Sequence, residues 1–160
     1  MREDIKIKTN DSIFKLRVSG LLVKENKVLI VQMNNNGFYC LPGGHVELNE
    51  DSKEAVIREF EEETNIPVKI KKQIAIAENF FPALNKIKVH EIGIYYLLET
   101  DSDIILENFQ RIEEDKGKKV LLDFRWIKTE EIDKVKFRPK FLMNKIIKNN
   151  YEFEHIIIKE

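Results

Sequence analysis

One segment of this chain has the pattern of a helix with two well-defined ends. Asp51 or Ser52 can cap its first turn, and the helical pattern continues to about Thr64. Asn65 can then adopt the left-handed backbone that often ends a helix, and Pro67 cannot continue one. We therefore predict one helix between these signals, and the remaining elements have to position it.

The segments on either side of this helix have the composition of strands. They are rich in Val, Ile and Leu, partly alternate with polar residues, and are bounded by turn residues. The predicted strands cover residues 14–23, 27–32, 68–79, 86–100 and 120–127. Strands interspersed with helices indicate an α/β or α+β fold with a mixed sheet covered by helices.

The second half of the chain contains weaker signals. Residues 101–119 are polar and charged, and we predict a functional or mobile loop there. Residues 129–135 and 140–148 are predicted to form two short helices, followed by an apolar tail. The length suits one domain, and we expect residues 1–160 to form a single one.

Charge and cysteine content limit the range of partners and compartments. The chain has 27 Lys and Arg against 28 Asp and Glu, so its net charge of −1 provides no field that would steer nucleic acid or an anionic membrane. Cys40 is the only cysteine, and no apolar run is long enough to span a bilayer. We expect a cytoplasmic protein, with neither membrane nor nucleic acid as its partner.

Three carboxylates should share one side of the predicted helix. Glu59, Glu62 and Glu63 are spaced three and four residues apart, which returns them to one face within a sector of roughly 100°. If such a group is half-buried, each like-charged pair costs roughly 3 kcal/mol, and a divalent cation would reverse the sign. Hard oxygen ligands favour Mg²⁺ or Mn²⁺. The alternative is a solvated face that Arg58 and Lys53 neutralise through ordinary surface pairs.

The residues before the helix favour a binding site over a solvated face. Gly43 and Gly44 form a pair without side chains, where the backbone could approach a phosphate or the helix closely. Taken alone, a Gly-Gly turn carries little weight. Its position just before an acidic helix makes it stronger evidence for a binding site.

Together these residues match a known pattern. Gly44, five residues, Glu50, seven residues, Arg58-Glu59, apolar Phe60, one residue, Glu62-Glu63, one residue, Asn65 and apolar Ile66 closely resemble the Nudix box. The usual pattern has Gly where this chain has Asn65. Asn is the commonest other residue to accept a left-handed backbone, so the departure is small if that is the role of the position.

The resemblance implies a fold, an activity and a set of site residues. It implies an α/β/α sandwich with a mixed β-sheet, and hydrolysis of a nucleoside diphosphate linked to another moiety. Glu59, Glu62 and Glu63 would bind catalytic Mg²⁺ or Mn²⁺, with the backbone of Gly44 as a further metal-binding group. Arg58 would hold Glu50 and orient the acids. Both are therefore included among the catalytic residues.

Other candidates lie outside the box. Glu113 and Glu114 lie in the middle of the predicted loop, where a mobile segment could bring a further carboxylate to the attacking water. Candidate residues for contacting the substrate are Gly43, Gly44, Arg17, Glu47, Glu91 and Tyr39. Arg17 could reach a phosphate and Tyr39 could stack on a base. An ordinary salt bridge and core packing are the respective alternatives.

The sequence leaves the substrate open. Nucleotide sugars, dinucleoside polyphosphates and nucleoside triphosphates all fit a small-molecule nucleotide substrate, because the loops that select among them have no known position. The alternative function is a Nudix-like domain that binds a nucleotide or RNA as a regulator without cleaving it. Dimers are common among proteins with this resemblance, so a homodimer is compatible with the chain, but the sequence does not determine the oligomeric state.

Overall fold

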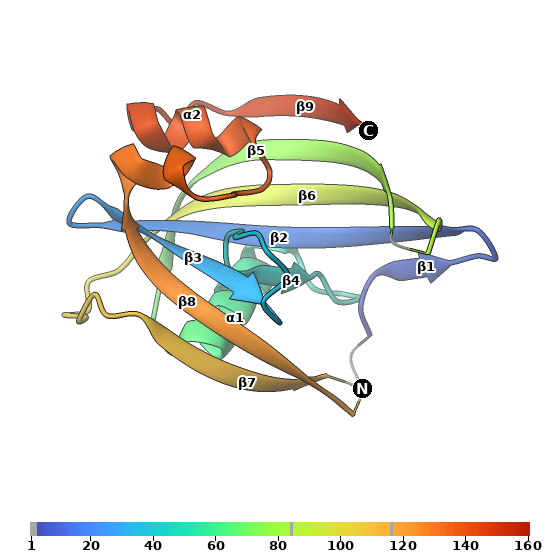
Figure 1. Ribbon diagram of the computed structural model, residues 1–160, viewed down its shortest axis with the longest axis horizontal. Coiled ribbons are helices and arrows are strands. Elements are labelled where there is room, and N and C mark those ends of the chain that lie inside the picture. Colours follow the sequence, from blue (N-terminus) through green and yellow to red (C-terminus); the bar gives the residue numbers. More distant parts are fainter. Residues whose placement is uncertain (1–2, 84, 116) are drawn as a thin grey trace.

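The computed structural model describes residues 3–83, 85–115 and 117–160 of the chain (Figure 1). The elements are β1 (Lys6–Lys8), β2 (Ser12–Lys24), β3 (Lys27–Met33), β4 (Gly43–His45), α1 (Ser52–Thr64), β5 (Lys69–Pro82), β6 (Lys88–Glu99), β7 (Phe109–Asp115), β8 (Lys118–Lys128), the 3₁₀ helix η1 (Thr129–Lys134), α2 (Phe141–Lys148) and β9 (Glu154–Lys159). Within these described residues, no helix is long and apolar enough to cross a membrane.

The strands form one mixed sheet in the order β7-β8-β3-β2-β6-β5-β9. The pairs β2–β6 and β5–β9 are parallel, and the other neighbouring pairs are antiparallel. The register between β2 and β3 covers only the hairpin end, at Val23 and Lys24. Further along β2, the strand β4 pairs with Arg17–Ser19 in place of β3. The Gly-Gly segment thus lies where the two halves of the sheet separate.

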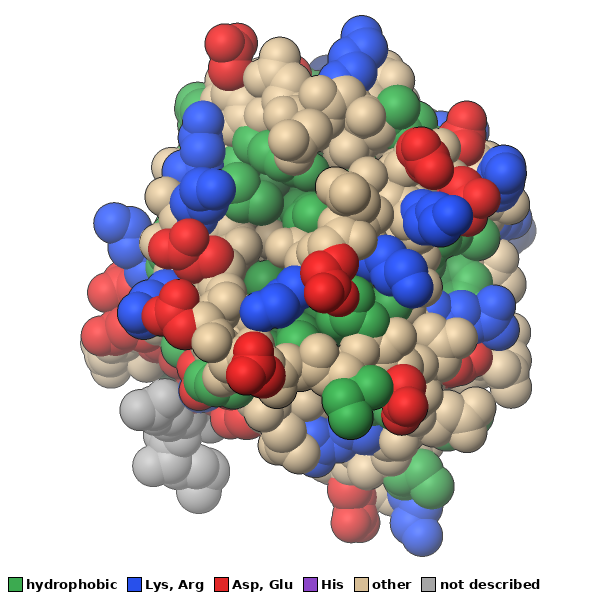
Figure 2. All heavy atoms as spheres, turned by 90° about the vertical axis from the view of Figure 1, so that its left-hand side faces the viewer, with side chains coloured by type: hydrophobic (Ala, Val, Ile, Leu, Met, Phe, Trp, Pro, Cys, Tyr) green, Lys and Arg blue, Asp and Glu red, His purple; other side chains and the backbone are tan. Residues whose placement is uncertain are grey.

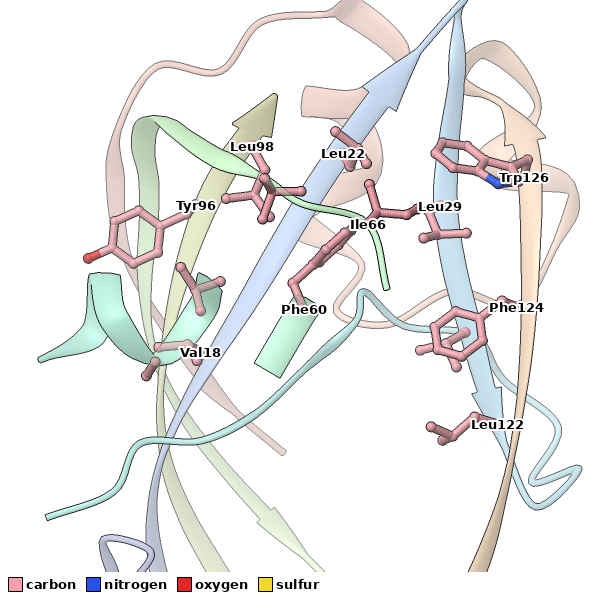
Figure 3. Close-up of a cluster of buried hydrophobic side chains, with 14 of the residues drawn as sticks. Val18, Leu22, Leu29, Phe60, Ile66, Tyr96, Leu98, Leu122, Phe124 and Trp126 are labelled. Carbon is pink, nitrogen blue, oxygen red and sulfur yellow. The ribbon is translucent and has the colours of Figure 1, made fainter. Parts of the chain in front are cut away.

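Apolar residues pack in two clusters, one on each face of the sheet, because successive strand residues point to opposite faces. Val18 and Leu22 of β2 face α1, whereas Leu21 faces α2. Figure 3 shows Phe60 of α1 pointing into the same space as Leu22 and other strand residues. Phe60 is fully buried, which stabilises the docked helix by about 2–3 kcal/mol. Figure 1 shows α1 and α2 on opposite sides of the sheet.

The predicted ends of helix α1 are confirmed. Asp51 is the N-cap and forms a capping box with Glu54, each side chain accepting from the other residue's backbone N–H. At the C-terminal end Asn65 has φ 59°, and its N–H donates to the carbonyl of Glu61. Asn65 therefore adopts a left-handed conformation at the position where the Nudix pattern usually has Gly. The five predicted strands and the helix at 140–148 are also present.

Two segments differ from the prediction. The prediction of a loop over residues 101–119 is wrong for its second half, because Phe109–Asp115 forms the edge strand β7. An edge strand can be rich in charged residues because one side of it faces solvent. The apolar tail forms a further strand, β9, which pairs with β5. Only one face of β9 is packed, with Ile156 and Ile158 against the core and Ile157 exposed.

The surface carries both signs of charge. On the face of the molecule drawn in Figure 2, acidic and basic side chains are interspersed, and neither sign forms a continuous patch. This agrees with the net charge of −1. A site for a charged ligand has to be built from a local cluster of side chains.

Candidate functional site

The two glycines of β4 are required for different physical reasons. A Cβ atom added to Gly43 would overlap the backbone oxygen of Val18 on β2. A Cβ added to Gly44 would lie 2.6 Å from Oε1 of Glu59 and closer still to the rest of that carboxylate. Gly43 therefore permits close strand packing, whereas Gly44 makes room for an acidic side chain of α1.

The guanidinium group of Arg58 lies at the centre of a cluster of carboxylates. Its Nε and Nη2 donate to the two oxygens of Glu50 at 2.6 and 2.9 Å, a bidentate pair. Its Nη1 donates to Glu59 Oε1 at 2.9 Å and to Glu62 Oε2 at 3.4 Å. The same nitrogen lies 3.6 Å from Oε1 of Glu47. These hydrogen bonds, led by the one to Glu50, raise the pKa of Arg58 above its ordinary value.

Two of the helix carboxylates are held in an environment that disfavours their charge. Only 8% of Glu63 is exposed, and burial raises its pKa to about 8, with further contributions from the charges of Glu59 and Glu113. A hydrogen bond from the backbone of Gly43 acts in the opposite direction. Burial also raises the pKa of Glu59 to about 7, against the lowering effect of Arg58. Glu62 is exposed, with 56% of its side chain accessible.

The edge strand β7 brings one of the two loop candidates near this cluster. Glu113 raises the pKa of both Glu59 and Glu63 through its charge, which places it within electrostatic range of the helix carboxylates. Glu114 is the next residue of the strand and so points to the opposite face, in register with Lys119. The two acids are separated by the pleat of a strand, and the predicted mid-loop position is wrong for both.

Sequence reasoning missed Arg111, which connects β7 to the helix. Its Nη1 donates to the backbone oxygens of Glu62 and Glu63 at 3.0 and 3.1 Å. The last turn of α1 has no basic residue of its own, so Arg111 supplies the cation that a helix C-terminus favours. Arg111 and Glu113 are two residues apart and lie on one face of β7. The contact of Arg111 with the end of α1 therefore also brings Glu113 toward the helix carboxylates.

We predict that Arg111→Gln lowers the free energy of unfolding by about 1–2 kcal/mol, because two helix carbonyls lose a charged donor. Urea unfolding monitored by circular dichroism measures this change. Lys119→Gln is the control, since it removes one positive charge from the same hairpin and is exposed. We expect less than about 0.5 kcal/mol for that variant. Equal losses of unfolding free energy in both variants would show that Arg111 acts only through its charge, and not through its hydrogen bonds to the helix.

The side chains present suit a hard divalent cation, although their arrangement is not yet that of a metal site. Among residues 3–83, 85–115 and 117–160, no three Asp, Glu, His or Cys side chains converge closely enough to hold a metal ion. Arg58 Nη1 instead occupies the position between Glu59 and Glu62. The donors are carboxylate oxygens, two of them reluctant to ionise without a counter-charge, and Gly44 leaves space beside Glu59. The chemistry of these donors is therefore compatible with a cation, which would have to displace Nη1 from between Glu59 and Glu62.

The candidates on β2 and β6 lie on the sheet face opposite α1. Arg17 is half-buried, and both Glu91 and Glu63 raise its pKa through their charges, although burial acts against them. Glu91 forms an ion pair with Lys15, with Oε2 3.7 Å from Nζ. Arg17 therefore lies within electrostatic range of both Glu63 on the helix and Glu91 on the sheet.

Tyr39 does not present an open ring. It is 7% exposed and packs in the core cluster on the α2 face. The guanidinium carbon of Arg125 lies 5.3 Å from the centre of its ring, in cation–π contact. Stacking on a base would require that contact to be displaced.

Several known proteins are similar to this chain in sequence. A family model described as the NUDIX domain matches residues 14–145. An ADP-ribose pyrophosphatase of Methanocaldococcus jannaschii is 42% identical over 85 residues, which are 51% of this chain and 48% of that protein. A probable DHNTP pyrophosphohydrolase of Lactococcus lactis is 34% identical over 91 residues, 54% of this chain and 55% of that protein. The chain spans about half the length of these curated relatives.

Solved structures agree on the fold. A NUDIX hydrolase from Nitrosomonas europaea has a TM-score of 0.62 at 21% identity, covering 96% of this chain and 82% of that one. A mutator MutT protein from Bacillus halodurans has a TM-score of 0.60 at 17% identity, covering 90% and 89%. The mixed sheet with its acidic helix is therefore an α/β fold of the Nudix type. Since the family model matches most of its length, the chain belongs to the Nudix family.

Proposed function

We propose that this protein is a metal-dependent hydrolase that cleaves the pyrophosphate linkage of a nucleoside diphosphate derivative. The main support is the excess of carboxylate around a single arginine. Glu47, Glu50, Glu59 and Glu62 all lie within 4 Å of Arg58, and Glu63 is buried beside them. A protein has little reason to gather this much negative charge unless a cation shares it. Family membership supports the same activity.

The names of the relatives support the reaction class. One relative is named an ADP-ribose pyrophosphatase and another a probable DHNTP pyrophosphohydrolase, and both names describe cleavage of a pyrophosphate linkage. Their leaving groups differ. The relatives therefore favour a shared reaction and leave the substrate to be argued from the residues of this chain.

The proposed roles follow from the geometry of the cluster. Glu59, Glu62 and Glu63 would hold a divalent cation, Mg²⁺ or Mn²⁺ by the chemistry of the donors. Such an ion would neutralise charge on the diphosphate and lower the pKa of a water molecule. Arg58 orients the acids through its bidentate pair with Glu50, a pair that can persist when Nη1 releases its hydrogen bonds to Glu59 and Glu62.

Other residues of the chain would act on the substrate and the water. Arg17, a partly buried residue, would offer its guanidinium to a phosphate oxygen near the acidic helix. Glu113 provides a carboxylate within electrostatic range of Glu59 and Glu63, where it could accept a proton from the attacking water. The backbone of Gly43 and Gly44 lies beside the same carboxylates and can approach a phosphate closely.

The test is turnover with and without divalent ions. Purified protein with Mg²⁺ or Mn²⁺ should release a nucleoside monophosphate from ADP-ribose or a dinucleoside polyphosphate, or pyrophosphate from a triphosphate, and EDTA should stop it. Glu62→Gln should lower kcat by about 10²-fold or more. Glu61→Gln is the matched control on the same helix, because Glu61 has no contact with Arg58 among the ion pairs of the described residues.

One outcome would favour the regulatory alternative. If the protein bound these compounds tightly with Mg²⁺ or Mn²⁺ and hydrolysed none of them, the domain would be a nucleotide-binding module. Equal activity of the Glu61 and Glu62 variants would instead contradict the assignment of the cation site.

A further inference from the structure

Three neighbouring strands place polar side chains in one row across the sheet. Lys15 of β2 is in register with Glu91 of β6, and Glu91 is in register with Asn79 of β5. Cross-strand partners point to the same face, so these three side chains lie side by side on the face opposite α1. We call them the Lys15–Glu91–Asn79 row.

The row is mostly buried and incompletely satisfied. The side chains of Lys15 and Glu91 are 22% and 14% exposed, and their charged atoms lie 3.7 Å apart, longer than a strong hydrogen bond. Oδ1 of Asn79 is buried, and within the described part of the chain no group donates a hydrogen bond to it. Buried acceptors in native proteins are nearly always paired, so an unpaired one requires an explanation.

The row continues to the proposed catalytic cluster. Arg17 follows Lys15 by two residues and therefore points to the same face of β2. Its charge interacts with those of both Glu91 and Glu63, so it lies within electrostatic range of the row and of the acidic helix. A diphosphate beside the acidic helix would have Arg17 as its next positive neighbour, and the group beyond that phosphate would meet the row.

The chemistry of the row selects the kind of group it can bind. Glu91 and Asn79 Oδ1 are acceptors, and a ligand satisfies them only with donors such as hydroxyl groups. A further phosphate carries no donors at neutral pH and would face the carboxylate of Glu91. The charge of Lys15 is already partly compensated by Glu91, and its flexible side chain could reach a phosphate placed beside Arg17.

We propose that the Lys15–Glu91–Asn79 row binds a hydroxyl-bearing group, such as a sugar, esterified to the far phosphate of the substrate. This inference rests on the proposed pyrophosphohydrolase function and narrows it. The preferred substrates are nucleoside diphosphate sugars, and nucleoside triphosphates are poor ones. The row thus determines specificity, whereas the helix carboxylates carry out the reaction.

The experiment compares substrates that share one base. We expect the wild-type protein to have a kcat/KM for ADP-ribose about tenfold or more above that for ATP. Asn79→Leu should raise the KM for ADP-ribose about tenfold, leave its kcat nearly unchanged, and lower the preference ratio accordingly. Asn144→Leu is the matched control, because it makes the same substitution on the exposed surface of α2. Thermal melting verifies that both variants fold.

Each outcome decides the proposal. If ATP is cleaved as efficiently as ADP-ribose, or if the ratio of the two kcat/KM values is unchanged in Asn79→Leu, the row does not select sugars. The hydrolase function would still stand.

A lower kcat/KM for 2′-deoxy-ATP than for ATP would assign the row to the nucleoside ribose and overturn the proposal. If Asn79→Leu does not fold, the wild-type ratio remains the test. If neither compound is cleaved, the proposed function fails, and calorimetric affinities for ADP-ribose and ADP still show whether the row binds the sugar.

Discussion

Replacing Glu63 with Gln is expected to lower kcat on the order of 10³-fold and, without metal, to make the protein more stable at alkaline pH. The loss of activity follows from removing a proposed ligand of the cation. The gain in stability follows from burial, because folding forces a carboxylate that is 8% exposed into an environment that raises its pKa to about 8. Gln has nearly the same size and cannot ionise, so the variant does not pay the free-energy cost of a buried charged carboxylate.

The pH dependence of this gain has a definite sign. The unfolded chain releases the Glu63 proton near pH 4.5, whereas the folded chain retains it up to about pH 8. The folded state therefore binds more protons between these values, and the wild-type protein loses up to about 1.4 kcal/mol per pH unit across that window relative to the variant. Thermal melting in EDTA from pH 5 to pH 8.5 measures the difference.

Divalent ions provide the internal control for Glu63→Gln. Mg²⁺ or Mn²⁺ should stabilise the wild-type protein at pH 8, because a ligand that binds only the folded state shifts the unfolding equilibrium. The variant should respond much less. A Gln variant that melts like the wild-type protein in EDTA at every pH would show that Glu63 is not held against its ionisation.

Gly44→Ala is expected to reduce activity by about 10²-fold while changing the melting temperature little. The new Cβ would occupy the place of the Glu59 carboxylate, which sits at the end of a flexible side chain and can turn away. The fold is then preserved and a proposed cation ligand is displaced. Steady-state kinetics and the affinity for Mn²⁺, measured by electron paramagnetic resonance, give two independent readings of the effect.

Gly43→Ala is the contrasting substitution at the neighbouring residue. Its Cβ would overlap the backbone oxygen of Val18, which cannot move without distorting β2. We expect this variant to lose stability by about 1–3 kcal/mol, as overpacked positions do. If Gly44→Ala were instead the more destabilising of the two with normal metal affinity, the close approach of Glu59 to Gly44 would have no functional meaning.

The features that could be predicted from the sequence are local in the chain. Asp51 and Asn65 determine the ends of α1 through hydrogen bonds and backbone angles within a few residues of each. The spacing of Glu59 and Glu63 fixes their common face by helix geometry alone. The Nudix box is a contiguous pattern of this kind, and for that reason its resemblance led to the correct family and fold class.

The features that could not be predicted depend on pairing between distant segments. Arg111 gains its role only when β7 lies beside the end of α1, and a charged edge strand has no apolar alternation to reveal it. The row of Lys15, Glu91 and Asn79 arises from the register of three strands. A shift of one residue in either pairing would turn one of these side chains to the other face.

The position of Arg58 also bears on the stability of the proposed cation site when no cation is bound. Many small metal sites lose their structure when the ion leaves, because binding of the ion supplies part of the free energy of folding. Here Arg58 Nη1 bridges Glu59 and Glu62, and its other nitrogens remain fixed on Glu50. In the proposed site, Arg58 Nη1 therefore supplies positive charge at the place where a cation would bind. A cation would have to compete with this side chain, and we expect the fold to persist when the cation is removed.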